Sequence, residues 1–146
     1  MTRVEEIMNR RVVTVAPEMT LAAVVELFTE NHVGGAPVVA ADGRVIGMIS
    51  ELQLLDVVFD LDARETPVSA YMTPKVECLL PHDTLSHAAQ MFALYSFRRL
   101  PVIDEGRLVG IVTRRDLMNY ALGTGTKLAE PLFELIPDLA ELTWSP

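Results

Sequence analysis

The chain has 146 residues, of which half are hydrophobic, and it carries a net charge of −8, so it can bury a full core. The acidic balance argues against general nucleic-acid binding, which needs a basic face that neutralises phosphates. The composition also argues against a membrane protein, because no apolar run approaches the roughly 20 residues that cross a bilayer.

The first half of the chain predicts a series of short helices and strands. Thr20 precedes an apolar stripe and predicts a helix N-cap, and Ser50 predicts another. Asp42 and Gly43 predict the tight turn of a hairpin. In chain order the predicted elements are a helical turn at 4–8, strand 12–15, helix 21–28, strands 36–39 and 45–49, and helix 51–58.

The second half repeats the first, with predicted helices at 85–95 and 117–121. One group of positions recurs at a fixed offset: Val4, Met8, Pro17, Thr20, Leu21, Phe28 and Pro37 return as Val68, Met72, Pro81, Thr84, Leu85, Phe92 and Pro101. A repeat of this kind usually cannot bury its apolar face alone. We therefore expect two β-α-β-β-α repeats, at 1–58 and 68–121, to pack with pseudo-twofold symmetry in an α/β (α+β) fold.

Two further segments lie outside the repeats. Residues 59–67 form a charged linker. Residues 122–146 form an acidic tail that is broken by prolines and carries scattered leucines and Trp144. The apolar side chains of the tail can pack on the body of the protein, on a partner subunit, or on nothing, and we favour partial packing.

Three spaced motifs resemble the cystathionine-β-synthase (CBS) domain, whose tandem pair is called a Bateman module. The first is Val-x-Thr-Val-x-Pro-x-x-Thr-Leu at 12–21. The second is Leu-Pro-Val-Ile-Asp at 100–104, and the third is Gly-Ile-Val-Thr-x-x-Asp at 110–116. The resemblance covers about residues 4–121 and implies the fold of that family.

The resemblance also implies a ligand that contains adenosine, held in the cleft between the repeats. The candidates are AMP, ADP, ATP and S-adenosylmethionine. Asp116 is the implied acceptor of the ribose hydroxyls, and Thr113 lies on the phosphate side. The other implied ligand-binding residues are Arg98, Arg99 and Lys75 for phosphate and Thr73, Val76 and Pro101 for the base.

The chemistry of these residue types supports the same roles. A carboxylate can accept hydrogen bonds from both hydroxyls of a diol, and arginine presents a planar fork to phosphate oxygens. However, Thr-x-x-Asp before an apolar run is also an N-capping pattern, and Asp116 fits that role with nothing bound. Arg114 and Arg115 are typical of solvated helix residues.

The first repeat departs from the pattern where charge matters. Gln53 replaces the aspartate, and Gly34-Gly35 stands where the second repeat has Arg98-Arg99. Ser50 and Gln53 still form a capping box. We therefore expect one competent site and a second, weak or empty one, formed by Ser50, Gln53, Val12 and Pro37.

These expectations combine into a regulatory module that senses a ligand without catalysis, as a homodimer. The sequence shows no activated nucleophile and no phosphate-binding loop. A metal site is not expected either, because His82 and His87 do not share a helical face. The alternative is an adaptor that has an empty cleft and acts through its dimer surface and tail. Cys78 is the only cysteine and no secretory signal opens the chain, which favours the reducing cytoplasm.

Overall fold

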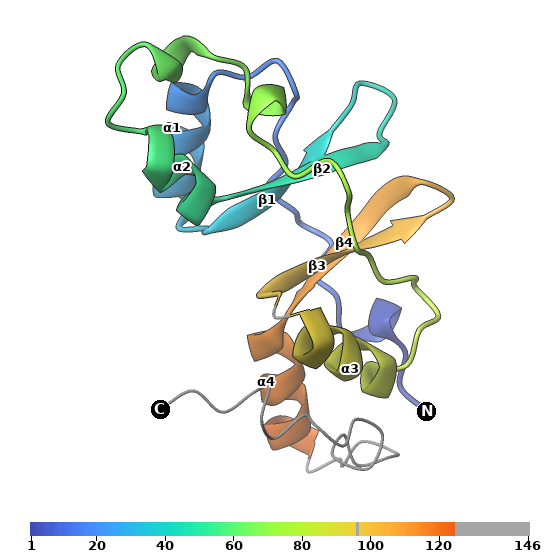
Figure 1. Cartoon of the computed structure of the whole chain (residues 1–146). Coiled ribbons are helices and arrows are strands. Elements are labelled where there is room, and N and C mark those ends of the chain that lie inside the picture. The colour runs from blue at the N-terminus through green and yellow to red at the C-terminus, as the bar shows by residue number, and fades with distance from the viewer. Residues whose placement is uncertain (96, 125–146) are drawn as a thin grey trace. The chain divides into compact units, whose positions relative to one another are not determined.

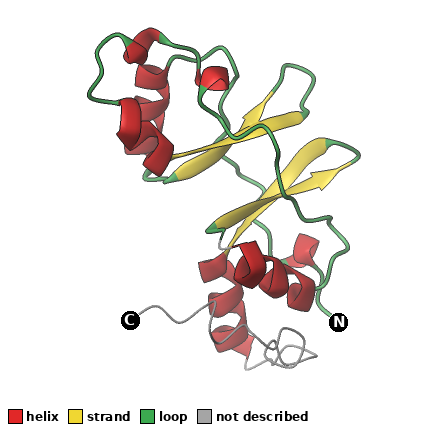
Figure 2. Cartoon of the chain, in the orientation of Figure 1, coloured by secondary structure: helices red, strands yellow, loops and turns green. Residues whose placement is uncertain are grey.

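The computed structural model describes residues 1–95 and 97–124 (Figure 1). This part of the chain is α+β, with four α-helices and two separate two-stranded antiparallel sheets (Figure 2). No helix in it is long and apolar enough to cross a membrane. The elements are α1 (Leu21–Asn31), β1 (Gly35–Val39), β2 (Val45–Ser50), α2 (Glu51–Val57), α3 (Leu85–Tyr95), β3 (Arg99–Asp104), β4 (Arg107–Thr113) and α4 (Arg114–Thr124), with 3₁₀ turns at Val4–Glu6, Ala63–Glu65 and Val68–Ala70.

The chain divides into two compact units, which we describe separately. The repeat-one unit comprises residues 11–77 and the short stretch 105–108. The repeat-two unit comprises residues 1–10, 78–104 and those from 109 on. The repeat-one unit contains α1, α2 and the β1–β2 hairpin, and the repeat-two unit contains α3, α4 and the β3–β4 hairpin except for its tip at 105–108. The opening segment of each sequence repeat belongs to the unit of the other repeat.

Helix starts follow the predicted caps. The Thr20 side chain accepts a hydrogen bond from the Ala23 N–H at 3.2 Å, and Ser50 caps α2 directly after β2. The helix predicted at 117–121 in fact begins at Arg114, because Thr113 and Asp116 form a capping box at the end of β4. The prediction started that helix three residues too late.

The strand predicted at 12–15 is wrong except at one residue. Val15 forms a parallel bridge with β1: its N–H donates to Pro37 O, and its carbonyl accepts from Val39 N–H. The next bond of a parallel ladder would run from the nitrogen of Pro37 to the carbonyl of Val13. Proline has no N–H, so the ladder stops there. Leu79 pairs with β3 in the same way beside Pro101.

The two hydrophobic cores contain the exchanged opening segments. Val4 and Met8 are buried in the core of the repeat-two unit with Leu79, Leu100 and Val112. A corresponding segment from the start of the second repeat, with Val68 buried and Met72 packed against it, joins the core of the repeat-one unit. Each core therefore contains apolar side chains from the opening segment of the other sequence repeat.

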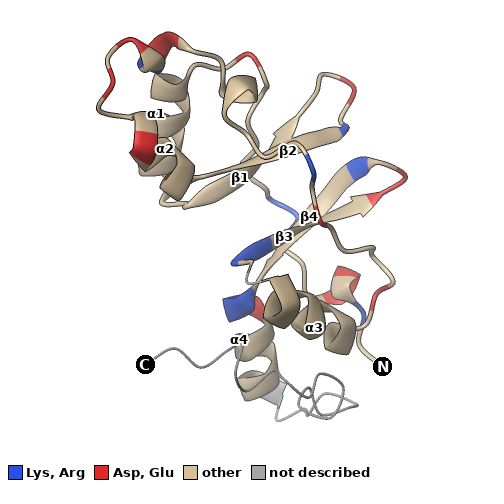
Figure 3. Ribbon diagram, viewed as in Figure 1, with Lys and Arg blue, Asp and Glu red and all other residues tan. Residues whose placement is uncertain are grey.

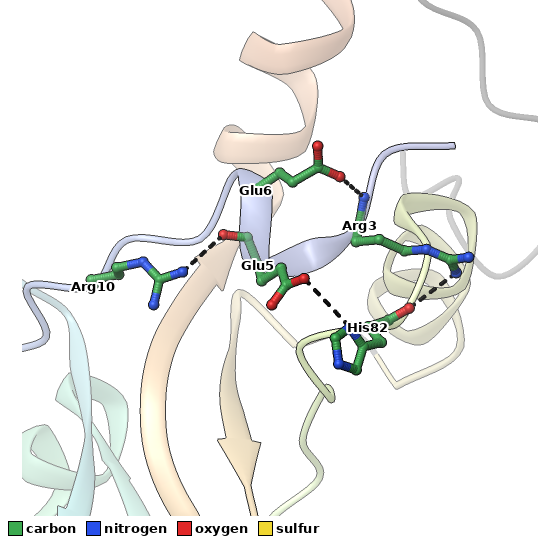
Figure 4. A network of polar contacts seen from close by, with 5 residues as sticks. All are labelled: Arg3, Glu5, Glu6, Arg10 and His82. Atoms are coloured by element: carbon green, nitrogen blue, oxygen red, sulfur yellow. Dashed lines mark hydrogen bonds and ion pairs between the residues drawn. The ribbon is translucent and has the colours of Figure 1, made fainter.

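Polar contacts also hold the first opening segment in place (Figure 4). In the repeat-two unit, the Arg3 guanidinium donates to the His82 carbonyl at 3.0 Å, and the His82 ring lies 3.4 Å from a Glu5 carboxylate oxygen. The Val4 N–H donates to Asp83 O at 2.8 Å. The segment before Asn9 is thus fixed to the loop that precedes α3.

The linker at 59–67 is packed rather than extended away from the body. Ala63 is buried in the core of the repeat-one unit, and the Arg64 Nε donates to Val58 O at 2.9 Å. The Leu21 N–H donates to Thr66 O at 3.0 Å. The linker therefore covers the start of α1. The acidic tail lies outside the described residues from 125 on.

Candidate functional site

The strongest candidate site lies where β4 meets α4 in the repeat-two unit. The Thr113 N–H donates to Asp116 Oδ2 at 2.8 Å, and the Asp116 N–H donates to Thr113 Oγ1 at 3.1 Å. Asp116 is therefore a capping residue, as one of the two interpretations required. Among the described residues, Oδ1 of Asp116 has no hydrogen-bond partner. One carboxylate oxygen therefore caps the helix, and the other makes no hydrogen bond within the part of the chain that the structure describes.

Arginines gather beside this carboxylate. The Arg114 N–H donates to Arg98 O at 3.3 Å, which places the start of β3 against the start of α4. The Arg114 Nε donates to Phe97 O at 2.5 Å. The Arg98 and Arg115 side chains are exposed, and Arg99 is half-buried. In Figure 3 this basic region stands out at the first residues of β3 and the first turn of α4.

The combination suits an anion. An N-terminal helix turn favours negative charge, and the basic side chains add to that potential. Most guanidinium groups in this region also lack a carboxylate partner: among the described residues, Arg98, Arg114 and Arg115 form no ion pair. The arrangement thus combines a carboxylate, which can accept hydrogen bonds from hydroxyl groups, with guanidinium groups, which can bind phosphate oxygens.

The opening segment of the chain runs beside this site, which sequence reasoning missed. Asn9 and Ile111 exchange two backbone hydrogen bonds, both at 2.9 Å. Asn9 occupies in this unit the position that Thr73 occupies in the other, since the two residues are equivalent in the repeat. The signal was present in the repeat offset, but the exchange of segments could not be foreseen from it.

Three of the other predicted ligand-binding residues belong to the other compact unit. Thr73, Lys75 and Val76 belong to the repeat-one unit rather than to the unit of Asp116. Pro101 is in the repeat-two unit but fully buried, and its carbonyl accepts the Leu79 N–H at 2.9 Å. Within the repeat-two unit, the start of β3, which holds Arg98 and Arg99, lies next to Thr113 and Asp116.

The equivalent position in the repeat-one unit uses up its polar groups internally. Gln53 Oε1 accepts from the Ser50 N–H at 2.9 Å, which completes the predicted capping box. Gln53 Nε2 donates to Tyr71 O at 3.0 Å and to Thr73 Oγ1 at 3.1 Å. Both amide hydrogens are thus committed. The Gln53 side chain ties residues 71–73 to α2.

The rest of the second predicted site is similarly closed. Ser50 is engaged in its cap, and Pro37 is fully buried with its carbonyl bonded to Val15. Val12 is half-buried in the same unit. This neutral, internally bonded arrangement contrasts with the charged site at Asp116.

His82 and His87, the two histidines considered for a metal site, approach different carboxylates. His82 approaches Glu5 at 3.4 Å, and His87 approaches Asp83 at 3.8 Å. Across residues 1–95 and 97–124, no group of three or more His, Cys, Asp or Glu side chains is arranged to hold a metal ion.

Comparison with known proteins gives a family for both repeats. The family model described as CBS domain matches twice, at residues 4–60 and 68–123. The CBS domain-containing protein YhcV of Bacillus subtilis is 34% identical over 121 residues, covering 80% of this chain and 84% of that protein. An uncharacterised protein of Methanocaldococcus jannaschii, MJ1225, is also 34% identical, but the chain spans only 41% of its length.

Solved structures of similar proteins include one with a bound nucleotide. The crystal structure of CBSX2 in complex with AMP superposes with a TM-score of 0.80 at 29% identity. The match covers 86% of this chain and 100% of that one. CBSX2 is a CBS-pair protein from Arabidopsis thaliana.

Proposed function

Because the chain belongs to the CBS-domain family and carries two CBS domains in tandem, we propose that it is a non-catalytic regulatory module. Its ligand contains adenosine and binds at Asp116 in the repeat-two unit. The candidate ligands are AMP, ADP, ATP and S-adenosylmethionine. The AMP complex of CBSX2 supports this class of ligand.

One observation carries the proposal: at the two equivalent positions, the side chains differ in how many of their hydrogen-bonding groups lack a partner within the protein. One carboxylate oxygen of Asp116 accepts the capping hydrogen bond, and the other has no partner among the described residues and lies near a group of arginines. The side-chain oxygen of Gln53 accepts from Ser50, and its amide nitrogen donates to Tyr71 and Thr73. In this proposal Asp116 accepts the ribose diol, and Arg98 and Arg99 meet the phosphates.

Regulation requires more than binding. The ligand must bind two arrangements of the protein with different affinities, since equal affinity shifts no population. We propose that the protein acts as a homodimer in the cytoplasm and that a further protein responds to the change in packing. Closed twofold pairs are the commonest form of oligomer.

The test is a thermal-melting titration of the purified protein with AMP, ADP, ATP and S-adenosylmethionine. Saturation at 100 times the dissociation constant should add about 2.7 kcal/mol of stability. Asp116→Asn keeps an oxygen for the cap but removes the charge, and should weaken binding by about tenfold or more. No shift with any of the four compounds would favour the adaptor function instead.

A second ligand provides the control for the diol. The 2′-deoxy form of the best nucleotide should bind the native protein more weakly, because one hydroxyl is missing. In Asp116→Asn the same deoxy substitution should cost clearly less. If the deoxy penalty is equal in both proteins, Asp116 does not hold the ribose. Gln53→Ala should leave the nucleotide affinity unchanged.

A further inference from the structure

The side chain of Gln53 fastens a distant segment to the first turn of α2 in the repeat-one unit. Its Nε2 donates to the Tyr71 carbonyl at 3.0 Å and to Thr73 Oγ1 at 3.1 Å. Met48 of β2 forms two backbone hydrogen bonds with Thr73, at 2.9 and 2.8 Å. The opening segment of the second sequence repeat is therefore held by both the strand and the helix of this unit.

The opening segment of the chain, residues 1–10, takes the equivalent place in the repeat-two unit. Asn9 corresponds in the repeat to Thr73, and Ile111 of β4 corresponds to Met48. Asn9 and Ile111 exchange the same two backbone hydrogen bonds, both at 2.9 Å. The contacts with the strand are therefore the same in both units, and the difference between the units lies at the helix.

Asp116, which stands in the first turn of α4 where α2 has Gln53, cannot make the corresponding bonds. A carboxylate has no donor hydrogen, whereas a side-chain amide has two. The aspartate side chain is also shorter by one methylene group, and its Oδ2 accepts from the Thr113 N–H at 2.8 Å. The carbonyl of Ile7, which corresponds in the repeat to that of Tyr71, therefore receives no hydrogen bond from the Asp116 side chain.

The other contacts of the opening segment lie at its first residues and in the core. Thr2 Oγ1 and the Tyr120 hydroxyl form a hydrogen bond of 2.6 Å, and Figure 4 shows the polar contacts with the loop before α3. Val4 and Met8 are buried together in the core of the repeat-two unit. Because both side chains belong to one core, the segment should detach and reattach as one unit.

We propose that the ligand bound at Asp116 fastens the opening segment to the first turn of α4, as Gln53 fastens residues 71–73 to α2. The hydroxyl and amino groups of an adenosine supply the donors that the carboxylate lacks. This inference rests on the proposed function and specifies what binding regulates, namely the attachment of residues 1–10. One unit thus holds its segment at all times through a side chain, and the other holds it firmly only when ligand is present.

The variant Asp116→Gln tests the proposal in the absence of ligand. Its amide should fasten the opening segment permanently and slow hydrogen exchange at the amides of Val4, Glu5 and Asn9 by about fivefold or more, because it adds hydrogen bonds. Asp116→Asn is the matched control, since its amide is one methylene group too short, and it should leave these rates unchanged. Unchanged rates in Asp116→Gln would contradict the proposal.

The reverse variant, Gln53→Glu, removes the amide hydrogens but keeps the side-chain length and the capping oxygen. Exchange at the Thr73 amide should become faster by about fivefold or more, because the helix no longer holds the segment. The amides of Asn9 and Ile111 in the other unit should keep their rates and serve as internal controls. An unchanged Thr73 rate would overturn the fastening role on which the proposal depends.

Hydrogen exchange of the native protein with the nucleotide that shifts its melting most separates this inference from the proposed function. A ligand that binds only the attached form, at 100 times its dissociation constant, should slow exchange at Val4, Glu5 and Asn9 together by about 100-fold. A melting shift with slower exchange at Asn9 alone, or at none of the three, would overturn the inference and leave the proposed function intact. A native protein that binds none of the four compounds would overturn both.

Discussion

At the scale of single residues, the two equivalent capping boxes contain different acceptors, Asp116 in one and Gln53 in the other. Both Asp116 and Gln53 complete the first turn of a helix by accepting a backbone N–H. The carboxylate has further acceptor capacity and a negative charge, whereas the amide has two donors that the protein itself occupies. The residue type thus decides whether the side chain keeps an acceptor without a partner in the described structure, as Asp116 does, or fastens one segment to another, as Gln53 does.

Gln53→Ala tests that fastening role. The variant loses the bonds to Tyr71 and Thr73 and one side of the α2 cap. We expect a loss of about 1–2 kcal/mol in the free energy of unfolding in urea, because each hydrogen bond contributes a net of about 0.5–1.5 kcal/mol. The total stays low because the bonds to Tyr71 and Thr73 are exposed. Glu51→Ala, at the neighbouring exposed position, should change stability by less than about 0.5 kcal/mol. Equal effects of the two variants would contradict the role assigned to Gln53.

At the scale of elements, the exchange of opening segments explains two glycines in β2 and β4. A Cβ on Gly110 would lie 2.5 Å from the sulfur of Met8, and one on Gly47 would lie 2.5 Å from the sulfur of Met72. Neither glycine has a positive φ that would itself require glycine. The close approach of a methionine from the opening segment is the reason, so each glycine is matched to a residue of the other sequence repeat.

A double-mutant cycle tests this matching. Gly110→Ala should destabilise the protein by about 1–3 kcal/mol through overpacking. Combined with Met8→Ala, its effect should be smaller than the sum of the single effects, with a coupling of about 0.5–3 kcal/mol measured by chemical denaturation. The pair Gly110→Ala and Met72→Ala serves as control and should be additive. Coupling of Gly110 to Met72 in place of Met8 would show that the segments are not exchanged.

At the scale of the whole molecule, the two repeats differ in charge: the second carries arginines at the start of α4, and the first carries carboxylates along α2 and the segment that follows it. The net charge of −8 is unevenly distributed, since residues 51–65 hold five carboxylates and the start of α4 holds two arginines. Duplication supplied the same elements twice, and substitution then gave them different chemistry. A ligand that binds only the repeat-two unit should therefore affect the two units unequally.

Hydrogen exchange with and without saturating nucleotide measures that inequality. Ligand should slow exchange at the amides of Asn9, Ile111 and Thr113, since Asn9 and Ile111 pair near the end of β4 and Thr113 donates to Asp116. The corresponding amides of Met48 and Thr73 in the repeat-one unit should change far less. Adenosine without phosphate should protect the same amides more weakly, because it lacks the groups that the arginines bind. Equal protection in both units would mean that the Gln53 position also binds ligand.

Much of the local structure followed from the sequence alone. Thr20, Ser50 and the turn at Asp42-Gly43 marked helix starts and a hairpin, because caps and turns depend on neighbouring residues. The repeat and the motifs at 12–21, 100–104 and 110–116 indicated the family, and capping by Asp116 was one of the two roles that the motif at 110–116 allowed. The asymmetry between Asp116 and Gln53 was also readable, since it is a difference of residue type at equivalent positions.

Three features were decided by tertiary structure. The strand expected at 12–15 was limited to Val15 because pairing depends on the N–H groups of another strand, which Pro37 cannot supply. The opening segments packed in the unit of the other repeat, which brought Asn9 to β4 and Thr73 to Gln53. Residue spacing reports contacts along one helix or strand, but a core accepts any segment of suitable shape, so the partner of Met8 could be known only from the folded chain.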